Sequence, residues 1–377
     1  GEWGQGLDIR FSESPDLLAY LLQECKALIE IGQSIGRGEA VAELETRATG
    51  LRQALRRSWD DGDGTFRHLD RELHVASEGK RLGGGRGECR VEVEGSYDPM
   101  VRLVVRVKGP EAEASKMRIT VHGRGPKGQF STERIDRDGF QWFWEYGTAT
   151  TENTFAHLKR VDVKGLSDSF QTEVLTADFR RRDLSLMLPL WSGTPEKERA
   201  QRLIEGAMLD PSLHWREGGL SACAADDPAY APEDRPFASG ISMIWNDMLG
   251  QALLEYDRRQ QAADLVLRLL SSATASLTTE GAFREVYDPD RAAGYGTRDS
   301  AHGLIPVGLF LDVLGVRLIT PWRVELVDSN PYPWPVRVGW RGLTVERPVD
   351  GPTYVRFPDG HEVEIGAAEA QIVERVR

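Results

Sequence analysis

The hydrophobic period of this 377-residue chain changes three times, and this alternation constrains the fold more than any other feature. Apolar residues first recur at helical spacing over about 14–55, where Ser14-Pro15 is typical of a helix start. Over about 86–179 apolar and polar residues alternate as in β-strands, with turn signals between them. Helical spacing returns over about 195–314, and alternation resumes from about Arg317. The pattern therefore predicts two helical parts, an inserted all-β part and a small β-rich tail.

Charge and cysteine content exclude several classes of protein. The net charge is -12, and the scattered Lys and Arg residues do not form the basic face that nucleic acids require. No apolar run approaches the roughly 20 residues that span a bilayer. Cys25, Cys89 and Cys223 are too few and too widely spaced for a disulfide framework or a zinc site. The first residues do not read as a signal peptide, which leaves the compartment unassigned, with the cytoplasm slightly favoured.

Two carboxylates stand in surroundings suited to acid–base catalysis. Asp8 follows Gly4-Gln5-Gly6-Leu7 just before the first helix, and Glu285 is expected on a loop between two later helices. Glycoside hydrolysis needs two such groups facing each other, one protonated and one ionised. Loops at one end of a rigid scaffold are the usual place for such groups. Asp8 and Glu285 are therefore the candidate catalytic residues, although an Asp on a Gly-rich loop can also simply cap a turn.

The segments around these acids resemble motifs of the trehalase and family 63 glycoside hydrolases. Asp8 lies in a Gly-x-Asp sequence beside Trp3, and Glu285 lies in a Phe-x-Glu-x-Tyr-Asp-Pro sequence. Three further segments between them are similar to those of the same group and follow in the same order: Trp59 to Phe66, Met187 to Gly193, and Gly218 to Tyr230. The residues from Trp334 to Leu343 look like the group's C-terminal sandwich.

This resemblance implies an inverting glycoside hydrolase acting on α-linked glucosides or mannosides, with no cofactor and no metal. Asp8 would be the general acid and Glu285 the general base, with their carboxyl groups about 6.5–9.5 Å apart. After Glu285 this group usually carries a Gly-Trp-Ser/Thr segment, whereas this chain has Gly296-Thr297-Arg298-Asp299-Ser300. That departure leaves the sugar, the linkage and the choice between exo and endo action open.

The resemblance also implies a mainly α fold, an (α/α)₆ toroid, of which this chain would hold the C-terminal half. The expected parts are 1–85 and 181–316 for the helical barrel, 86–180 for the inserted β-domain, and 317–377 for the C-terminal β-sandwich. A closed toroid is made of six helical hairpins, and the sequence supplies about half of them. Because a free half-barrel would expose a large apolar face, an upstream segment or a second chain is expected to complete it.

Several polar and aromatic residues are candidates for lining a sugar pocket, because sugars stack on aromatic faces and take paired hydrogen bonds. Trp245 could equally belong to an ordinary helix core. Trp215 and Glu217 are expected on a loop, where binding residues often lie. The full set is Trp3, Arg10, Trp215, Glu217, Arg235, Trp245, Asn246 and Tyr287.

Phe140, Trp142, Trp144 and Tyr146 would share one face of a strand in the β-domain. Such a stripe could be a carbohydrate-binding platform, but the inner face of a sandwich core is favoured. A different function class also stays open: a non-catalytic carbohydrate-binding or scaffold chain whose pocket lacks its other half. The ordered motifs favour the enzyme, and the missing half-barrel favours this alternative.

Overall fold

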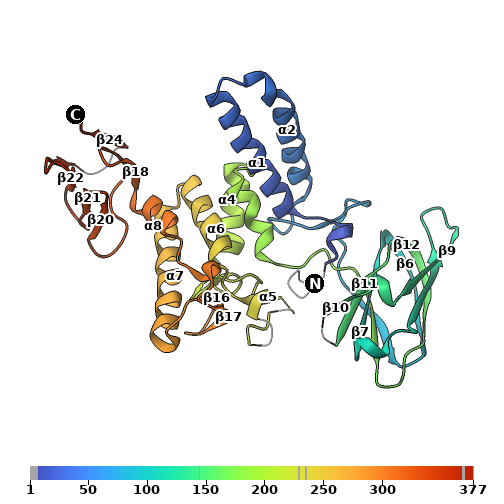
Figure 1. The fold of residues 1–377 in the computed structure, drawn as a ribbon. Coiled ribbons are helices and arrows are strands. Elements are labelled where there is room, and N and C mark those ends of the chain that lie inside the picture. The colour runs from blue at the N-terminus through green and yellow to red at the C-terminus, as the bar shows by residue number, and fades with distance from the viewer. Residues whose placement is uncertain (1–6, 144, 228–229, 234–235, 367–369, 377) are drawn as a thin grey trace. The chain divides into compact units, whose positions relative to one another are not determined.

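The computed structural model describes residues 7–143, 145–227, 230–233, 236–366 and 370–376. The chain divides into two compact units. The first is Gly1–Leu186 with Asp227–Ala229, and the second is Met187–Asp226 with Tyr230–Arg377. Helices and strands take similar shares of the chain, a mixed composition rather than the mainly α one predicted (Figure 1). The difference arises because short strand pairs also lie within the two parts expected to be helical, 1–85 and 181–316.

The first unit begins with a helical hairpin, α1 (Pro15–Ser34) and α2 (Ala42–Arg57), which lie side by side in Figure 1. Pro15 occupies the first helical position, as its preset φ favours. Leu22 and Cys25 of α1 pack against Ala48 and Leu55 of α2, and all four side chains are buried. Short strand pairs flank the hairpin: β1 (Ser12–Glu13) with β4 (Leu69–Asp70), and β2 (Trp59–Asp60) with β3 (Thr65–Phe66).

Two antiparallel sheets with a common core follow in the same unit. The five-stranded sheet has the order β10-β11-β7-β13-β5, and the four-stranded sheet has the order β6-β12-β8-β9. The strands are β5 (Arg81–Arg86), β6 (Cys89–Val101), β7 (Leu103–Lys108), β8 (Arg118–Arg124), β9 (Phe130–Asp136), β10 (Gln141–Phe143), β11 (Tyr146–Thr150), β12 (Phe155–Lys164) and β13 (Gln171–Thr176). Alternate residues such as Val105, Val107, Ile119 and Val121 are fully buried, so that each sheet contributes one apolar face to the core.

The aromatic stripe expected on one strand is divided between two. The chain turns between β10 and β11, which pair so that Trp142 faces Gly147. Phe140 is buried in the sandwich core and Trp142 packs against it, whereas Tyr146 is half exposed. Trp144 lies outside the described residues. A flat platform needs adjacent rings on one strand face, and the hairpin separates Tyr146 from Phe140 and Trp142.

The second unit contains the remaining helices: α3 (Leu188–Trp191), α4 (Lys197–Leu203), α5 (Pro236–Ser239), α6 (Met243–Glu255), α7 (Arg259–Glu280) and α8 (Val307–Leu314). The single helix expected over 237–256 is interrupted between α5 and α6, where Ile241 makes backbone bridges to Ser221 and Tyr287. Gly281 ends α7 in the left-handed conformation that glycine tolerates best. Among the described helices, none combines the length and apolar character required to cross a membrane.

Short strands complete the second unit. Two hairpins, β14 (Trp215–Arg216) with β15 (Gly219–Leu220) and β16 (Arg284–Tyr287) with β17 (Gly294–Arg298), lie among the helices. The tail forms a three-stranded sheet, β18-β19-β24, and a four-stranded meander, β20-β21-β22-β23. Their bounds are β18 (Val316–Thr320), β19 (Arg323–Leu326), β20 (Val336–Trp340), β21 (Leu343–Arg347), β22 (Thr353–Arg356), β23 (Glu362–Ile365) and β24 (Gln371–Glu374).

A buried arginine joins the helical and β parts of the first unit. Arg102, between β6 and β7, is 1% exposed, and its Nε donates to the Asp70 carboxylate at 2.7 Å. Its other nitrogens bond the Glu72 carboxylate and the backbone carbonyls of Thr151 and Glu152. Its guanidinium also lies over the Phe11 ring, 4.5 Å from the centroid. Asp70 is itself 1% exposed, so neither charge has water as an alternative partner.

We expect Arg102→Met to lower the free energy of unfolding by about 3–5 kcal/mol, because it leaves the Asp70 carboxylate buried without its cation. Chemical denaturation followed by circular dichroism measures this change. Arg106→Met is the matched control, since Arg106 lies on the neighbouring β7 strand with its side chain 46% exposed. An equal loss of stability in both variants would contradict the assignment.

Candidate active site

Asp8 is the first candidate, and the local backbone holds its side chain at the start of a short 3-10 turn, Ile9–Phe11. Its Oδ1 accepts the backbone N–H of Arg10 at 3.0 Å, so Asp8 caps the turn. The Arg10 guanidinium also binds the carboxylate, and its Nη2 donates to Oδ2 at 2.7 Å. The Asp8 side chain is 9% exposed, whereas that of Arg10 is 49% exposed. A carboxylate largely shielded from water is thus held by one arginine that itself reaches solvent.

The arginine determines the ionisation of Asp8. Burial is the largest single influence on the Asp8 pKa and raises it, because a shielded carboxylate is harder to charge. The side-chain and backbone hydrogen bonds from Arg10, together with its charge, outweigh burial and leave the pKa below its usual value. Asp8 is therefore ionised at neutral pH in this conformation. A general acid must carry a proton in order to donate it. Ionised Asp8 is therefore not in the form in which a general acid reacts.

Glu285 lies on β16, in a short hairpin instead of the loop expected. The pairing of β16 with β17 shifts register between Arg284 and Val286, which places Glu285 at the irregularity. Such bulges re-aim a side chain and are common beside active sites. Glu285 is half-buried, and its Oε2 accepts the backbone N–H of Thr297 at 3.3 Å. The position of this carboxylate thus depends on the backbone of the opposite strand.

Gly296 makes room for the Glu285 carboxylate. Its φ is +82°, and a Cβ there would lie 2.8 Å from Glu285 Oε2 and 2.8 Å from Phe237 Cζ. Both distances are shorter than packed atoms allow, so the carboxylate and the ring close around a glycine. Phe237 is a neighbour of the acid that the sequence motifs did not single out. The signal that could have pointed to Gly296 is the Gly-x-Gly pattern of β17, Gly294 to Gly296.

Tyrosine–aspartate pairs support the same hairpin. Tyr295 on β17 donates its hydroxyl to Asp288 at 2.8 Å, and Asp288 is 1% exposed. Burial, and then the Asp288 hydrogen bond, raise the pKa of Tyr295 to about 12, so it remains a donor at all ordinary pH values. Tyr230 donates to Asp290 at 2.7 Å, and Arg216 pairs with the same carboxylate at 2.7 Å. These bonds fix the turn that joins β16 to β17.

The other candidate pocket residues have different surroundings. Tyr287 is fully buried and donates its hydroxyl to the Gly303 carbonyl at 2.7 Å, and Asn246 is fully buried with its side chain bonded to Leu220 and Ser242. Both stabilise backbone turns, and their part in substrate binding stays a prediction. Trp215 is half-buried, and the Cζ atom of the Arg268 guanidinium lies 4.8 Å from the centroid of its indole ring. Glu217 is exposed. Trp245 is half-buried on α6.

Trp3 and Arg235 lie outside the described residues. Asp8 belongs to the first unit and Glu285 to the second, so the expected separation of their carboxyl groups stays a prediction. Across the described ranges, no group of three His, Cys, Asp or Glu side chains is arranged to hold a metal ion.

One family model matches the first part of the chain. Residues 4–85 match the model of the mannosylglycerate hydrolase MGH1-like glycoside hydrolase domain. This segment includes Asp8 and the helical hairpin, and it is similar to glycoside hydrolases. Within that class the resemblance to the family 63 group, which the sequence motifs predicted, is confirmed. A search of the curated proteins found no match.

Solved structures give likenesses of lower identity. The family 63 mannosylglycerate hydrolase of Thermus thermophilus in complex with Tris matches with 15% identity and a TM-score of 0.45, over 80% of this chain and 46% of that one. The same enzyme in complex with glucose matches with 14% identity and a TM-score of 0.43, over 80% of this chain and 47% of that one. A sialidase matches in fold with 9% identity and a TM-score of 0.50, over 96% of this chain and 25% of that one. The chain thus spans about half the length of the hydrolase structures.

We expect Gly296→Ala to reduce turnover of a glycoside substrate by on the order of 100-fold, because a methyl group there displaces the Glu285 carboxylate. Gly281→Ala is the matched control: its φ is also positive, +64°, but nothing lies within 4 Å of the added carbon. Both variants carry a comparable backbone penalty, so steady-state rates separate strain from displacement. Equal rates in the two variants would show that Glu285 does not need the space above Gly296.

Proposed function

We propose that this chain is a glycoside hydrolase that cleaves α-linked glucosides or mannosides with inversion, without a metal or cofactor. Asp8 is the proposed general acid and Glu285 the proposed general base. The observation that carries the proposal is the match of residues 4–85, which include Asp8, to a glycoside hydrolase domain. The position of Glu285 at a bulge, with its carboxylate seated over a glycine, supports the second assignment.

The proposed reaction needs a proton donor on one side of the bond and a proton acceptor on the other. Asp8 donates its proton to the glycosidic oxygen as the bond to the anomeric carbon breaks. Glu285 accepts a proton from water as the water oxygen attacks that carbon from the opposite face, so the configuration inverts. Glu285 then returns a proton to solvent, and Asp8 takes one up. Water is consumed, and one sugar with a free anomeric hydroxyl and one alcohol are released.

Asp8 must be protonated before it can act, and Arg10 opposes this. A neutral sugar that covers Asp8 removes water and favours the uncharged acid, since desolvation raises a carboxyl pKa. Arg10 can turn its guanidinium to solvent or to a sugar hydroxyl, because its side chain is half exposed. In this proposal Arg10 is a positioning residue that holds Asp8 ionised until the substrate arrives.

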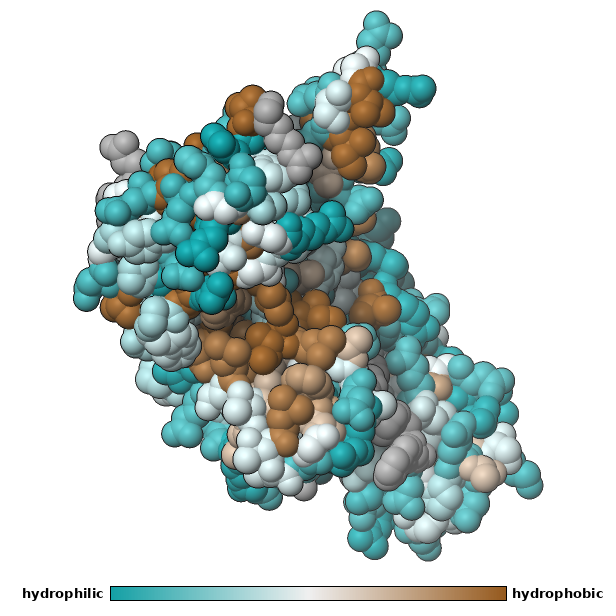
Figure 2. Space-filling model, turned by 60° about the vertical axis from the view of Figure 1, so that its left-hand side comes forward, coloured by the Kyte–Doolittle hydropathy of each residue, from teal (hydrophilic) through white to brown (hydrophobic). Residues whose placement is uncertain are grey.

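We also propose that the helices belong to one half of an (α/α)₆ toroid, completed by an upstream segment or a second chain. Apolar side chains remain exposed along α1, at Leu17, Leu21, Leu28 and Ile31, and near the start of α8, at Leu304 and Val307. Figure 2 shows apolar side chains gathered on the face that it draws. Exposed apolar surface of this kind marks contact sites, which supports a missing part of the barrel.

Glu285→Gln and Asp8→Asn are each expected to lower the rate of hydrolysis by about 10²–10⁴-fold, because each removes one proton-transfer group. The assay is a panel of α- and β-linked gluco- and manno-oligosaccharides, with the anomer of the first product read by NMR. Glu255→Gln, an exposed carboxylate at the end of α6, is the control and should keep the full rate. Near-normal rates in either catalytic variant, or retention of configuration, would contradict the assignment.

We expect Arg10→Gln to move the alkaline limb of the pH–rate profile to higher pH. Arg10 holds the Asp8 pKa below its usual value, so its removal raises that pKa. Activity that needs protonated Asp8 then persists to higher pH. An unchanged limb with a raised KM would instead show that Arg10 binds the substrate and does not govern the acid.

The second candidate is a non-catalytic carbohydrate-binding or scaffold chain. The Asp8–Arg10 ion pair favours it, because a carboxylate kept ionised cannot act as an acid. Absence of hydrolysis across the whole panel, with sugar binding retained, would select this candidate.

A further inference from the structure

One face of α1 carries a row of apolar side chains that reach solvent. The members of this row, which we call the α1 seam, are Leu17, Leu21, Glu24, Leu28, Ile31 and Ile35. They are spaced by four, three, four, three and four residues, so they lie on one side of the helix and its C-cap. The five apolar members are each between 41% and 64% exposed. Contiguous exposed apolar surface of this kind marks a contact site.

The seam is a second apolar face of α1, distinct from the face that forms the hairpin. Leu22 and Cys25 face α2 and are buried against Ala48 and Leu55. A helix at the surface of a protein ordinarily has one apolar stripe and a polar face opposite to it. The hairpin therefore covers only part of the apolar surface of α1, and the seam is available to another element.

The spacing of the seam fits one helix as its partner. Apolar positions that alternate by three and four residues recur about every 3.5 residues, which is the period of paired helices that pack side by side. Such helices cross at about 20°, and their side chains interlock along the contact. The seam extends along most of α1 (Pro15–Ser34), so a partner helix can follow it over several turns.

The charge of the seam selects among possible partner helices. Glu24 is the one charged member of the seam, and a carboxylate buried without a cation is costly. If two copies of the seam packed antiparallel about its centre, Glu24 would lie opposite Leu28; if they packed parallel, it would lie opposite its own counterpart. Neither arrangement supplies a cation, so the seam is poorly matched to a second copy of itself. A different helix with Lys or Arg opposite Glu24 satisfies the carboxylate.

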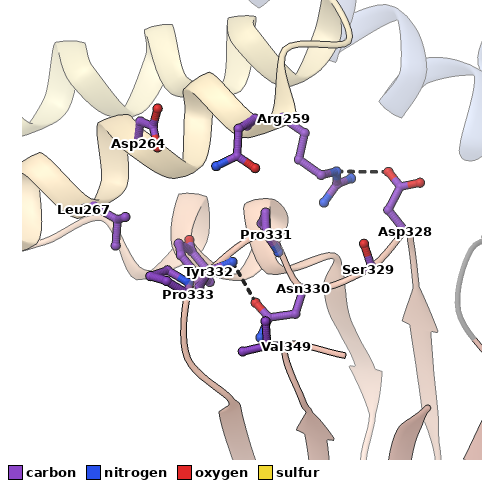
Figure 3. Close-up of a pocket in the computed structure, with 11 residues that line it drawn as sticks. Arg259, Asp264, Leu267, Asp328, Ser329, Asn330, Pro331, Tyr332, Pro333 and Val349 are labelled. Atoms are coloured by element: carbon purple, nitrogen blue, oxygen red, sulfur yellow. Dashed lines mark hydrogen bonds and ion pairs between the residues drawn. The ribbon is translucent and has the colours of Figure 1, made fainter. Parts of the chain in front are cut away.

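The C-terminal pocket, in the second unit, differs from the α1 seam. It lies between α7 and the loop that follows β19, and its volume is about 640 Å³. Figure 3 shows Arg259 of α7 paired with Asp328 of the loop, and the aromatic ring that lines this pocket, Tyr332, is buried. The cation and the ring are thus used within the fold, whereas the apolar members of the α1 seam are exposed.

We propose that the α1 seam is the docking surface for a helix of the missing half of the toroid, one with an apolar seam of its own and a Lys or Arg opposite Glu24. The inference rests on the proposed toroid and adds the chemistry of the element that completes it beside α1. The apolar members supply the buried contact, and the Glu24 ion pair fixes the register of the two helices. The cation also distinguishes this helix from other apolar helices, because a helix without it leaves the carboxylate buried and unpaired.

The test titrates the full chain with two designed helical peptides of three heptads, labelled with a fluorophore and followed by anisotropy. Both peptides have Leu at the outer seam positions, and the central seam position is Lys in one and Glu in the other. The Lys peptide is expected to bind the natural chain at least tenfold more tightly than the Glu peptide. Glu24→Lys should reverse this preference, and Leu28→Gln should weaken both peptides. Glu30→Lys is the matched control: it makes the same change of charge at an exposed position of α1 outside the seam, and should keep the preference of the natural chain.

Three results would overturn the proposal: equal affinity of the natural chain for the two peptides, an unchanged preference in Glu24→Lys, or a dimer of the chain alone that sedimentation detects and Leu28→Gln abolishes. The last result would show that a second copy occupies the seam. A reversed preference cannot come from misfolding, because a misfolded variant would lose affinity for both peptides. Hydrolysis does not enter this readout. A chain that cleaves no glycoside but reverses its preference would therefore contradict the proposed catalysis and leave the docking surface supported.

Discussion

The first unit depends on the burial of one positive charge. Arg102 is placed between two strands of the β-insertion and is bonded to Asp70 and Glu72, which follow the helical hairpin. A buried guanidinium without these carboxylates would be too costly to keep, so the hairpin and the sandwich stabilise each other's geometry. The same charge lies over the ring of Phe11, three residues beyond Asp8. The candidate acid is therefore anchored to the insertion through Phe11 and Arg102, and the insertion has a structural role at this segment.

The two candidate carboxylates are held by different means, and this suits different roles. Glu285 is positioned by the backbone N–H of Thr297 and by the space over Gly296, neither of which changes with pH. Asp8 is held by the backbone N–H of Arg10 and by its half-exposed guanidinium, and only the guanidinium can turn away to solvent. A base needs a constant position and an ionised state, whereas an acid in an inverting mechanism must gain and lose a proton in each cycle. A detachable partner permits that cycle.

Local patterns predicted much of this structure, and long-range contacts account for the differences. The helical spacing of Leu22, Cys25 and Leu55 predicted the first hairpin, and the alternation in 86–179 predicted its strands. The break between α5 and α6 depends on bridges from Ile241 to distant segments, which periodicity cannot reveal. Motifs drew attention to Glu285 but not to Phe237, because Phe237 approaches Gly296 and the carboxylate only in the folded chain. Tyr287 and Asn246 have the polar side chains expected of sugar-binding residues. In the fold both are buried and hydrogen-bonded to the backbone.

The C-terminal pocket combines buried polar groups, which stabilise the fold, with polar groups that reach solvent. Arg347 and Asn330 are buried and bonded to backbone carbonyls, so their chemistry is used within the fold. Gln260 and Asp264 of α7 are the exposed polar side chains on the opposite side of this pocket. The buried arginine and asparagine thus order the loop, and the helix supplies the polar groups that reach solvent.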